Sequence, residues 1–335
     1  MDSLFPINFS DSMLSDVWRC ELSFFRRHCQ RLYSGAKNPD LIAGGHIAKA
    51  CEIVRNAYFT DKLSEEEAIE LGKEYILKGE DTGDSIKTND TLAYVLGKYF
   101  TKYSLEDSLP PCKLVDGTHA VEYKFEFDLG IPHPEIKNIN LKFVGKLDYL
   151  CEEYILGKVK RYVLDEKTTK MIYRVAGSKG AINYAKEKEA YNVSGQFIAY
   201  HWAARQLGIE TQASLIRRLP ILATFEEAFE LEIPINNFMI DQWYISTYNK
   251  ILDLVEKYKI YLSHIKDNSK RNPQEVFYPI YKDGCNSFSR ACAYKVGCMS
   301  KEGEQILEAT FSQRVWSREH EDTISLTDYK RGLDI

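Results

Sequence analysis

One hairpin restricts the fold of this chain more than any other segment. Two strand-like runs, LKFVGKLDYL and KVKRYVLDEKT, lie on either side of Leu156-Gly157. Residues 148 and 165 are equally far from this turn, so strands that pair about it bring Asp148 and Asp165 directly opposite each other. Lys167 is two residues past Asp165 and therefore points to the same side. The sequence predicts two carboxylates and an ammonium on one face.

This combination of side chains suits a divalent metal ion. Two adjacent carboxylates repel each other unless a cation lies between them. Mg²⁺ and Mn²⁺ prefer hard oxygen ligands, polarise phosphoryl oxygens and lower the pKa of bound water. Lys167 could then orient the attacking water or offset charge on the phosphate. The alternative is an ordinary surface hairpin with a cross-strand charge cluster, because charged residues make up 28% of the chain. The first interpretation predicts phosphodiester cleavage.

Three further segments accompany the hairpin. Residues 186–207 are predicted to form a helix in which Gln196 and Tyr200 share a face. Upstream, His46 follows Ala-Gly-Gly and precedes IAKACE, where a helix is expected to open. Glu122 lies in the alternating run AVEYKFEF. Asp-x-Lys followed by Gln-x-x-x-Tyr, with the upstream histidine, resembles the RecB-like branch of the PD-(D/E)xK nuclease superfamily.

The resemblance implies how the metal is held. His46, Asp148 and Asp165 would be metal ligands, and the backbone carbonyl of Glu166 would complete the inner shell. Lys167 would be the catalytic lysine. Many members of the family have Glu where this chain has Asp165, and both residues occur there.

The resemblance also implies contacts with DNA. Gln196 and Tyr200 would position the DNA strand near the cut. Glu122 matches an acidic residue that often opens the first strand of the core and whose role varies within the family.

Eight cysteines form a second pattern, and three of them lie within CNSFSRACAYKVGC. Three thiolates within fourteen residues can surround one soft metal centre. The chain resembles AddB-type nuclease domains and the CRISPR adaptation nucleases, in which one cysteine before the core and three after it hold a [4Fe–4S] cluster. The ligands implied here are Cys20, Cys285, Cys292 and Cys298.

Two alternatives to this ligand set remain open. The spacing of the last three cysteines is wider than is often seen, which leaves zinc as the alternative metal. Cys29 is the rival to Cys20 as the N-terminal ligand. Cys51, Cys112 and Cys151 lie in apolar or strand-like surroundings and are interpreted as buried small hydrophobic residues.

The composition and charge of the chain limit the partners and the location that can be expected. The net charge of −5 counts against tight non-specific binding of duplex DNA, although a local basic groove remains compatible with it. There is no GxxxxGK[ST] segment, so any helicase that assists would be a separate protein, as would a recombination partner. No run of eighteen apolar residues or secretory signal occurs, so a cytoplasmic location without membrane contact is expected. The resemblance implies a bacterial or phage-infected cell. Candidate groove residues are Lys158, Lys160, Arg161, Lys167, Lys170, Arg174, Arg217 and Arg218.

The expected fold is α/β, with a PD-(D/E)xK restriction-endonuclease-like core of mixed sheet and flanking helices. The expected divisions are a helical part at 1–112, the core at 113–235, a helix and cysteine segment at 236–300 and a polar tail at 301–335. Helices are predicted at 10–35, 46–60, 64–79, 90–104, 186–207 and 236–266. Strands are predicted within 119–169, at 210–221 and at 229–235.

The leading functional hypothesis is a Mg²⁺- or Mn²⁺-dependent DNA exonuclease or nuclease with an iron–sulfur staple, acting on single strands or free ends. The alternative is a non-cleaving DNA-binding or assembly module of a recombination or repair complex with the same fold. A zinc-stapled protein unrelated to nucleic acid is a third reading. The intact set of His46, Asp148, Asp165 and Lys167 favours the enzyme.

Overall fold

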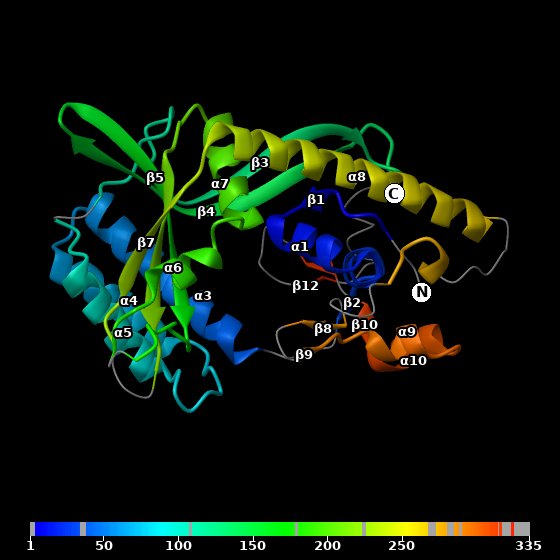
Figure 1. The fold of residues 1–335 in the computed structure, drawn as a ribbon, viewed down its shortest axis with the longest axis horizontal. Helices are drawn as coiled ribbons and strands as arrows, with labels where there is room; N and C mark the ends of the chain where they lie inside the picture. Colours follow the sequence, from blue (N-terminus) through cyan, green and yellow to red (C-terminus); the bar gives the residue numbers. More distant parts are fainter. Residues whose placement is uncertain are drawn as a thin grey trace. The chain divides into compact units, whose positions relative to one another are not determined.

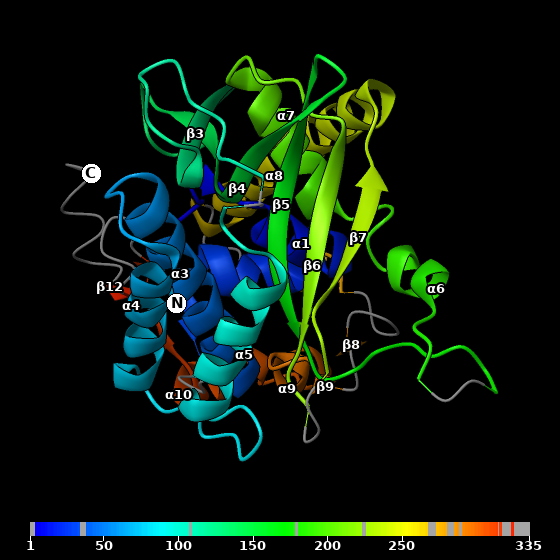
Figure 2. The ribbon, with the colours of Figure 1, turned by 90° about the vertical axis from the view of Figure 1, so that its left-hand side faces the viewer.

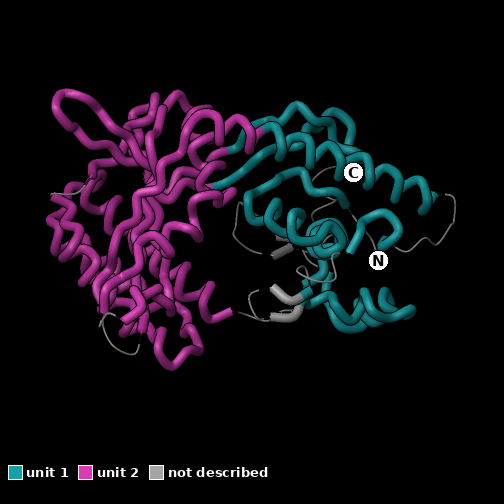
Figure 3. Tube along the Cα trace, viewed as in Figure 1, with its two compact units in different colours: residues 1–36, 126–145, 245–335 teal, residues 37–125, 146–244 magenta. Residues whose placement is uncertain are grey.

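The computed structural model describes most of the chain. It covers residues 4–33, 38–106, 109–177, 180–222, 226–266, 273–279, 285–287, 290–313, 315–316 and 323–324. The chain divides into two compact units (Figure 3). Unit 1 comprises residues 1–36, 126–145 and 245–335, and unit 2 comprises residues 37–125 and 146–244.

A mixed β-sheet forms the core of unit 2. Strand β4 (Asn140–Ile155) pairs antiparallel with β5 (Lys158–Thr169), which pairs in parallel with β6 (Ala213–Pro220). Strand β7 (Phe229–Pro234) is antiparallel to β6, and β3 (Val121–Pro132) pairs with β4 (Figure 2). Strands β3 and β4 have residues in both units.

The β4–β5 hairpin has the predicted register. Its pairs run from Ile155 opposite Lys158 to Tyr149 opposite Leu164, and the next pair in this register is Asp148 opposite Asp165. Leu156 and Gly157 both have positive φ, 49° and 75°, as a two-residue type I′ turn requires. The turn therefore sets the register, and the register places the two aspartates on one face.

Helices flank both faces of this sheet. Helices α3 (Pro39–Phe59), α4 (Glu65–Lys78) and α5 (Asn89–Lys102) share one hydrophobic core with the ends of β6 and β7 (Figure 2). Helix α7 (Gly195–Gln206) packs on the other face, where the His201 ring lies 2.9 Å from Ser214 Oγ on β6. The α/β fold class expected from the sequence, a mixed sheet with flanking helices and a helical N-terminal part, is confirmed.

Two helix predictions for unit 2 need correction. Helix α3 begins at Pro39 with Asn38 as its cap, so His46 lies inside the helix instead of opening it. The single helix predicted at 186–207 is two helices, α6 (Tyr184–Glu189) and α7. Residues 190–194 separate them, because Tyr, Asn, Val and Ser have only modest helix propensity and Gly195 follows. The capping box predicted from Ser64 and Glu67 is present at α4.

Unit 1 contains a broken helical segment where one helix was predicted at 10–35. Helix α1 (Asp11–Arg19) ends at Cys20, whose backbone is extended, and α2 (Glu21–Phe24) continues into a π-helical turn, η1 (Phe25–Cys29). The long helix α8 (Asn237–Lys266) enters unit 1 at residue 245. Its Tyr258 and Tyr261 pack against Phe25, and Phe25 stacks on Phe277.

Short elements complete unit 1 (Figure 1). Helix α10 (Gly303–Thr310) occupies part of the predicted polar tail. None of the described helices has the length and apolar character needed to cross a membrane. The remaining elements are β1 (Asn8–Phe9), which is parallel to β4, β2 (Leu32–Tyr33) paired with β10 (Ser312–Gln313), η2 (Pro273–Glu275), β8 (Asn286–Ser287) paired with β9 (Arg290–Ala291), α9 (Lys295–Met299) and β11 (Val315–Trp316) paired with β12 (Thr323–Ile324).

Candidate active site

The predicted aspartates meet on the α7 face of the sheet. Asp165 is fully buried, and the ammonium of Lys167 lies 2.6 Å from its Oδ2. Neither Asp165 oxygen has a hydrogen bond of normal geometry within the described part of the chain. Burial of an acceptor without a hydrogen bond costs about 1–3 kcal/mol. A buried carboxylate held this way fits a hard cation, which would take up both oxygens.

The charges around Asp165 also favour a bound cation. Burial raises the pKa of Asp165 well above its usual range, and the neighbouring Asp148 raises it further, against the opposing effect of Lys167. Burial alone would lower the pKa of Lys167, but Asp165 and Asp148 outweigh it and raise that pKa. The carboxylate of Asp148 therefore lies close enough to act on that of Asp165, as the register predicts. A divalent cation between them would relieve the repulsion.

A third carboxylate extends the site from β3. Glu122 is buried, and its φ of 50° is unusual for a residue other than glycine. Its carboxylate forms an ion pair with Lys146 on β4. Burial and then Asp148 raise the pKa of Glu122 to about 8. Strained backbone and a raised carboxyl pKa are both typical of functional sites.

Helix α3 carries the predicted ligand His46 and a further acidic residue, Glu52. The His46 ring packs on Gly79 and Tyr75, and its Nε2 lies 2.8 Å from the carbonyl oxygen of Glu80. Among the described residues, no hydrogen bond or ion pair joins His46 to Asp148 or Asp165. Glu52, six residues further along the helix, instead lies close enough to raise the pKa values of Glu122 and Lys146.

Gln196 and Tyr200 lie together at the start of α7, as their spacing predicts. Gln196 Nε2 donates a hydrogen bond of 2.8 Å to Tyr200 Oη. Phe197, between them in sequence, places its ring 5.8 Å from the Lys167 ammonium. Tyr191, just before the helix, interacts electrostatically with Lys167 and accepts a hydrogen bond from Arg218. The ring of Phe197 and the side chain of Tyr191 therefore lie near Lys167.

The side chain of Glu166 points to the opposite face. It forms a buried ion pair with Arg55 of α3 and accepts a hydrogen bond of 2.7 Å from Tyr99 Oη. These partners hold its pKa below the usual range, although burial alone would raise it. The side chain of Glu166 is thus engaged away from Asp165, and the role that the resemblance implies for Glu166 concerns its backbone carbonyl alone.

Four cysteines lie near one another in unit 1. Burial, followed by Cys292 and Cys20, raises the pKa of Cys285. Burial also raises the pKa of Cys298 to about 11, against the opposing effect of Arg26, while Cys292, Cys20 and Cys285 add to the increase. None of the eight cysteines, all of which lie in the described part of the chain, is in a disulfide. Within the described residues, no three side chains of metal-ligating type converge closely enough to hold one ion.

Arg26 and Cys29 have different positions relative to these thiols. The fully buried Arg26 donates a hydrogen bond to Cys298 Sγ at 3.4 Å and pairs with Glu304 at 3.0 Å. Cys29 is also fully buried, but the charges that act on it are those of Arg31 and Glu135. The donor chemistry of Cys20, Cys285, Cys292 and Cys298 fits a soft metal centre, because a bound cation would favour their thiolates over the neutral thiols.

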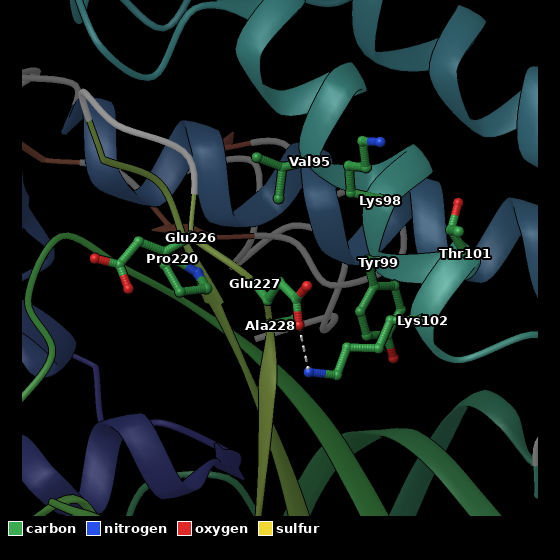
Figure 4. A pocket seen from close by; sticks show the side chains of 9 residues that line it. All are labelled: Val95, Lys98, Tyr99, Thr101, Lys102, Pro220, Glu226, Glu227 and Ala228. Carbon is green, nitrogen blue, oxygen red and sulfur yellow. Dashed lines mark hydrogen bonds and ion pairs between the residues drawn. The ribbon is translucent and has the colours of Figure 1, made fainter. Parts of the chain in front are cut away.

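A cavity of about 320 Å³ in unit 2 is lined by residues of α5, the end of β6 and the segment before β7 (Figure 4). Its rim includes the Lys102–Glu227 ion pair of 3.1 Å. Tyr99 lines it and also bonds to Glu166, so it borders the buried ion pair of that carboxylate. The residues predicted for the site lie outside its lining, which consists of Val95, Lys98, Tyr99, Thr101, Lys102, Pro220, Glu226, Glu227 and Ala228.

Comparison with known proteins gives distant similarity. No protein-family model and no curated protein matches the chain. A solved protein named "Putative exonuclease" from Eubacterium rectale is 15% identical, covers 79% of this chain and 83% of its own, and has a TM-score of 0.36. A second, SSO0001, is 11% identical, covers 63% of this chain and 84% of its own, and has a TM-score of 0.25. The candidate site is therefore assigned from the residues of this chain and not from these similarities.

Two residues of the site were not singled out in the sequence. Glu52 ends the IAKACE run that was quoted for His46, and Lys146 precedes Asp148 by two residues. The alternation of a strand would have placed Lys146 on the face of Asp148. Nothing in the sequence chooses between His46 and Glu52, because the packing of α3 against α4 decides which side of the helix faces the sheet.

Proposed function

We propose that this protein is a metal-dependent deoxyribonuclease that acts on single-stranded DNA or DNA ends, with exonuclease action as the first expectation. The observation that supports the proposal most is the pair of Asp148 and Asp165, opposite each other on β4 and β5, with Lys167 beside them. Beyond Lys167 and Asp148, the buried Asp165 oxygens have no hydrogen-bonding partner among the described residues, which gives a hard cation a reason to bind.

In this proposal each residue has a separate task. Asp148, Asp165 and the carbonyl of Glu166 hold Mg²⁺ or Mn²⁺. The ion, when bound, supplies an activated water and stabilises charge on the phosphate. Lys167 orients the water or the scissile phosphate, since its pKa is raised and it stays charged. Gln196 and Tyr200 hold the DNA strand near Lys167. His46 would join as a ligand after its ring leaves the Glu80 carbonyl.

We also propose that Cys20, Cys285, Cys292 and Cys298 hold a [4Fe–4S] cluster, with zinc as the alternative. The supporting observation is that Cys20 and Cys292 raise the pKa of both Cys285 and Cys298, while Cys29 responds to other groups. The cluster would link the start of α2 to the segment that carries α9. Such a link closes a very long loop and stabilises unit 1 by limiting the freedom of the unfolded chain.

Cleavage of end-labelled DNA tests the first proposal. Protein purified without oxygen is incubated with single- and double-stranded DNA in Mg²⁺ or Mn²⁺, with EDTA as the metal-free comparison. We expect Asp165→Ala to cut about 10³-fold more slowly or not at all. Asp128→Ala, at an exposed aspartate on β3, is the matched control and should cut at the wild-type rate.

Each outcome of this assay has a clear meaning. Wild-type cutting by Asp165→Ala would contradict the assigned site. No cutting by the folded, metal-loaded wild type would favour the non-cleaving DNA-binding or assembly module instead. The product ladder of the active protein gives the direction of digestion.

Metal content tests the second proposal. We expect about four iron atoms per chain in the wild type and in Cys29→Ala, and loss of iron in Cys20→Ala. Both substitutions remove a buried thiol, so the comparison isolates ligation from packing. About one zinc ion in place of iron would identify the alternative metal. Retention of metal by Cys20→Ala together with its loss in Cys29→Ala would exchange the two assignments.

A further inference from the structure

Two lysine–glutamate pairs link β3 to β4. Lys142 pairs with Glu126 at 2.6 Å, and Lys146 pairs with Glu122. Each pair is four residues from the other on both strands, in opposite directions, as neighbours in an antiparallel ladder are. Lys146 precedes Asp148 by two residues, so its side chain lies on the face that carries the two aspartates. Of these two pairs, only Lys146–Glu122 adjoins the candidate active site.

Three carboxylates act on Lys146. Its ion-pair partner Glu122 is buried and has a strained backbone, and Asp148 and Glu52 lie within electrostatic reach. Burial alone would lower the pKa of Lys146, but Glu122, Asp148 and Glu52 outweigh it and raise that pKa. Glu52 also binds Lys49, with 2.8 Å from the ammonium to each carboxylate oxygen. Lys146 is therefore a cation held among acidic groups from β3, β4 and α3.

We propose that the ammonium of Lys146 occupies the position of a second divalent ion, so that the site holds one divalent ion, at Asp148 and Asp165. This inference rests on the proposed function, because it refines the metal site of the same nuclease. Lys146 acts as a positioning residue that fixes Glu122 and excludes a second cation. Without it, Glu122 and Asp148 would offer oxygen ligands of the kind that Mg²⁺ and Mn²⁺ prefer.

The charge of the site supports one ion. The charge of Lys49 offsets that of Glu52. The remaining charges of the site are negative on Glu122, Asp148 and Asp165 and positive on Lys146 and Lys167. When all three carboxylates are ionised, one negative charge remains. One divalent ion turns this into one positive charge, which a DNA phosphate can neutralise. A second divalent ion would add two more positive charges within the same few ångströms, where like charges repel strongly.

The geometry separates this position from that of the first ion. Each of the two buried carboxylates has one ammonium, Lys167 at Asp165 and Lys146 at Glu122. Asp165 also has a second carboxylate, that of Asp148, opposite it on the hairpin. The pair of aspartates therefore keeps an excess of negative charge beside Lys167, whereas the charge of Glu122 is matched by that of Lys146. That difference predicts a single metal position, at the two aspartates, in the wild type.

Equilibrium titration with Mn²⁺ counts the ions held by the full-length protein. We expect roughly one tightly bound Mn²⁺ per chain in the wild type and roughly two in Lys146→Met. Lys142→Met removes the equivalent pair four residues away and should keep one ion. Lys146→Gln replaces Lys146→Met if the latter does not fold, as judged by circular dichroism. Asp165→Asn identifies the ion held at Asp148 and Asp165, because this substitution should abolish binding of that ion in the wild type and in each lysine variant.

The outcomes distinguish this inference from the proposed function. Two ions in the wild type, or one ion with unchanged affinity in both Lys146 variants, would overturn the inference while leaving the Asp165 site in place. No Mn²⁺ that depends on Asp165 in the wild type would overturn the metal site itself, and the inference with it. A second ion in Lys146→Met that Lys142→Met does not show would support the inference.

Discussion

Asp165 and Glu166 are neighbours on β5, and both carboxylates are buried, yet their surroundings have opposite effects. Glu166 faces Arg55 and Tyr99, and its pKa is lowered. Asp165 faces Asp148 and Lys167, and its pKa is raised. The difference shows that burial alone does not tell whether a carboxylate stabilises the fold or serves a site. The partners that each face of the strand supplies decide it.

The Glu166 face is a satisfied network. Arg55 stacks over the Tyr149 ring at 4.2 Å, and Tyr99 also accepts a hydrogen bond of 3.1 Å from Arg217. Arg217 in turn pairs with Glu230 at 2.8 Å. The Asp165 face keeps two like charges together, Asp148 and Asp165, beside the ammonium of Lys167. Such an arrangement lowers the stability of the fold. It is typical of a site where a bound ligand supplies the missing counter-charge.

Removal of the Glu166 carboxylate should have the larger effect on stability. We expect Glu166→Gln to lower the free energy of unfolding by about 3–5 kcal/mol, because it leaves the guanidinium of Arg55 buried without a counter-charge. Denaturant unfolding of the two proteins at pH 7 measures the difference. The double variant Arg55→Met with Glu166→Gln removes both charges and should recover much of the loss. Equal stability of Glu166→Gln and the wild type would show that the pair is not needed.

Asp165→Asn should have a smaller effect of the opposite sign. In the presence of EDTA we expect the free energy of unfolding at pH 7 to rise by about 1–3 kcal/mol, because a neutral amide replaces a carboxylate that burial disfavours. Unfolding measured from pH 4 to pH 8 also distinguishes the contribution of Asp165 to stability from that of Glu166. A fall in stability on this substitution would contradict the view of Asp165 as a site residue held at a cost.

The pH dependence follows from the sign of each pKa shift. The folded-state pKa of Asp165 is raised, so its contribution is present below the unfolded pKa and is lost as the pH rises towards the folded pKa. The folded-state pKa of Glu166 is lowered, so its contribution is present above the unfolded pKa and is lost as the pH falls through the folded pKa. Asp165→Asn should therefore flatten the decrease of stability with rising pH, while Glu166→Gln should remove the decrease on acidification.

The sequence predicted the structure correctly where a single turn or helix cap determines the local conformation. The midpoint of the hairpin predicted the Asp148–Asp165 register, since the Leu156-Gly157 turn admits one pairing. The spacing of Gln196 and Tyr200 placed them on one helical face. The broken helix at 190–194 was missed, because helical periodicity continues across residues of modest propensity.

The sequence by itself determined the hairpin, its register and the face on which Asp148, Asp165 and Lys167 gather, because the period of a strand and the geometry of its turn are local properties. Only the tertiary structure decided that Glu166 pairs with Arg55, that His46 turns to the Glu80 carbonyl and that Lys146 fills the space beside Glu122. These contacts join residues that are distant in sequence, and their geometry depends on how α3 and β3 pack against the hairpin. No local pattern carries that information.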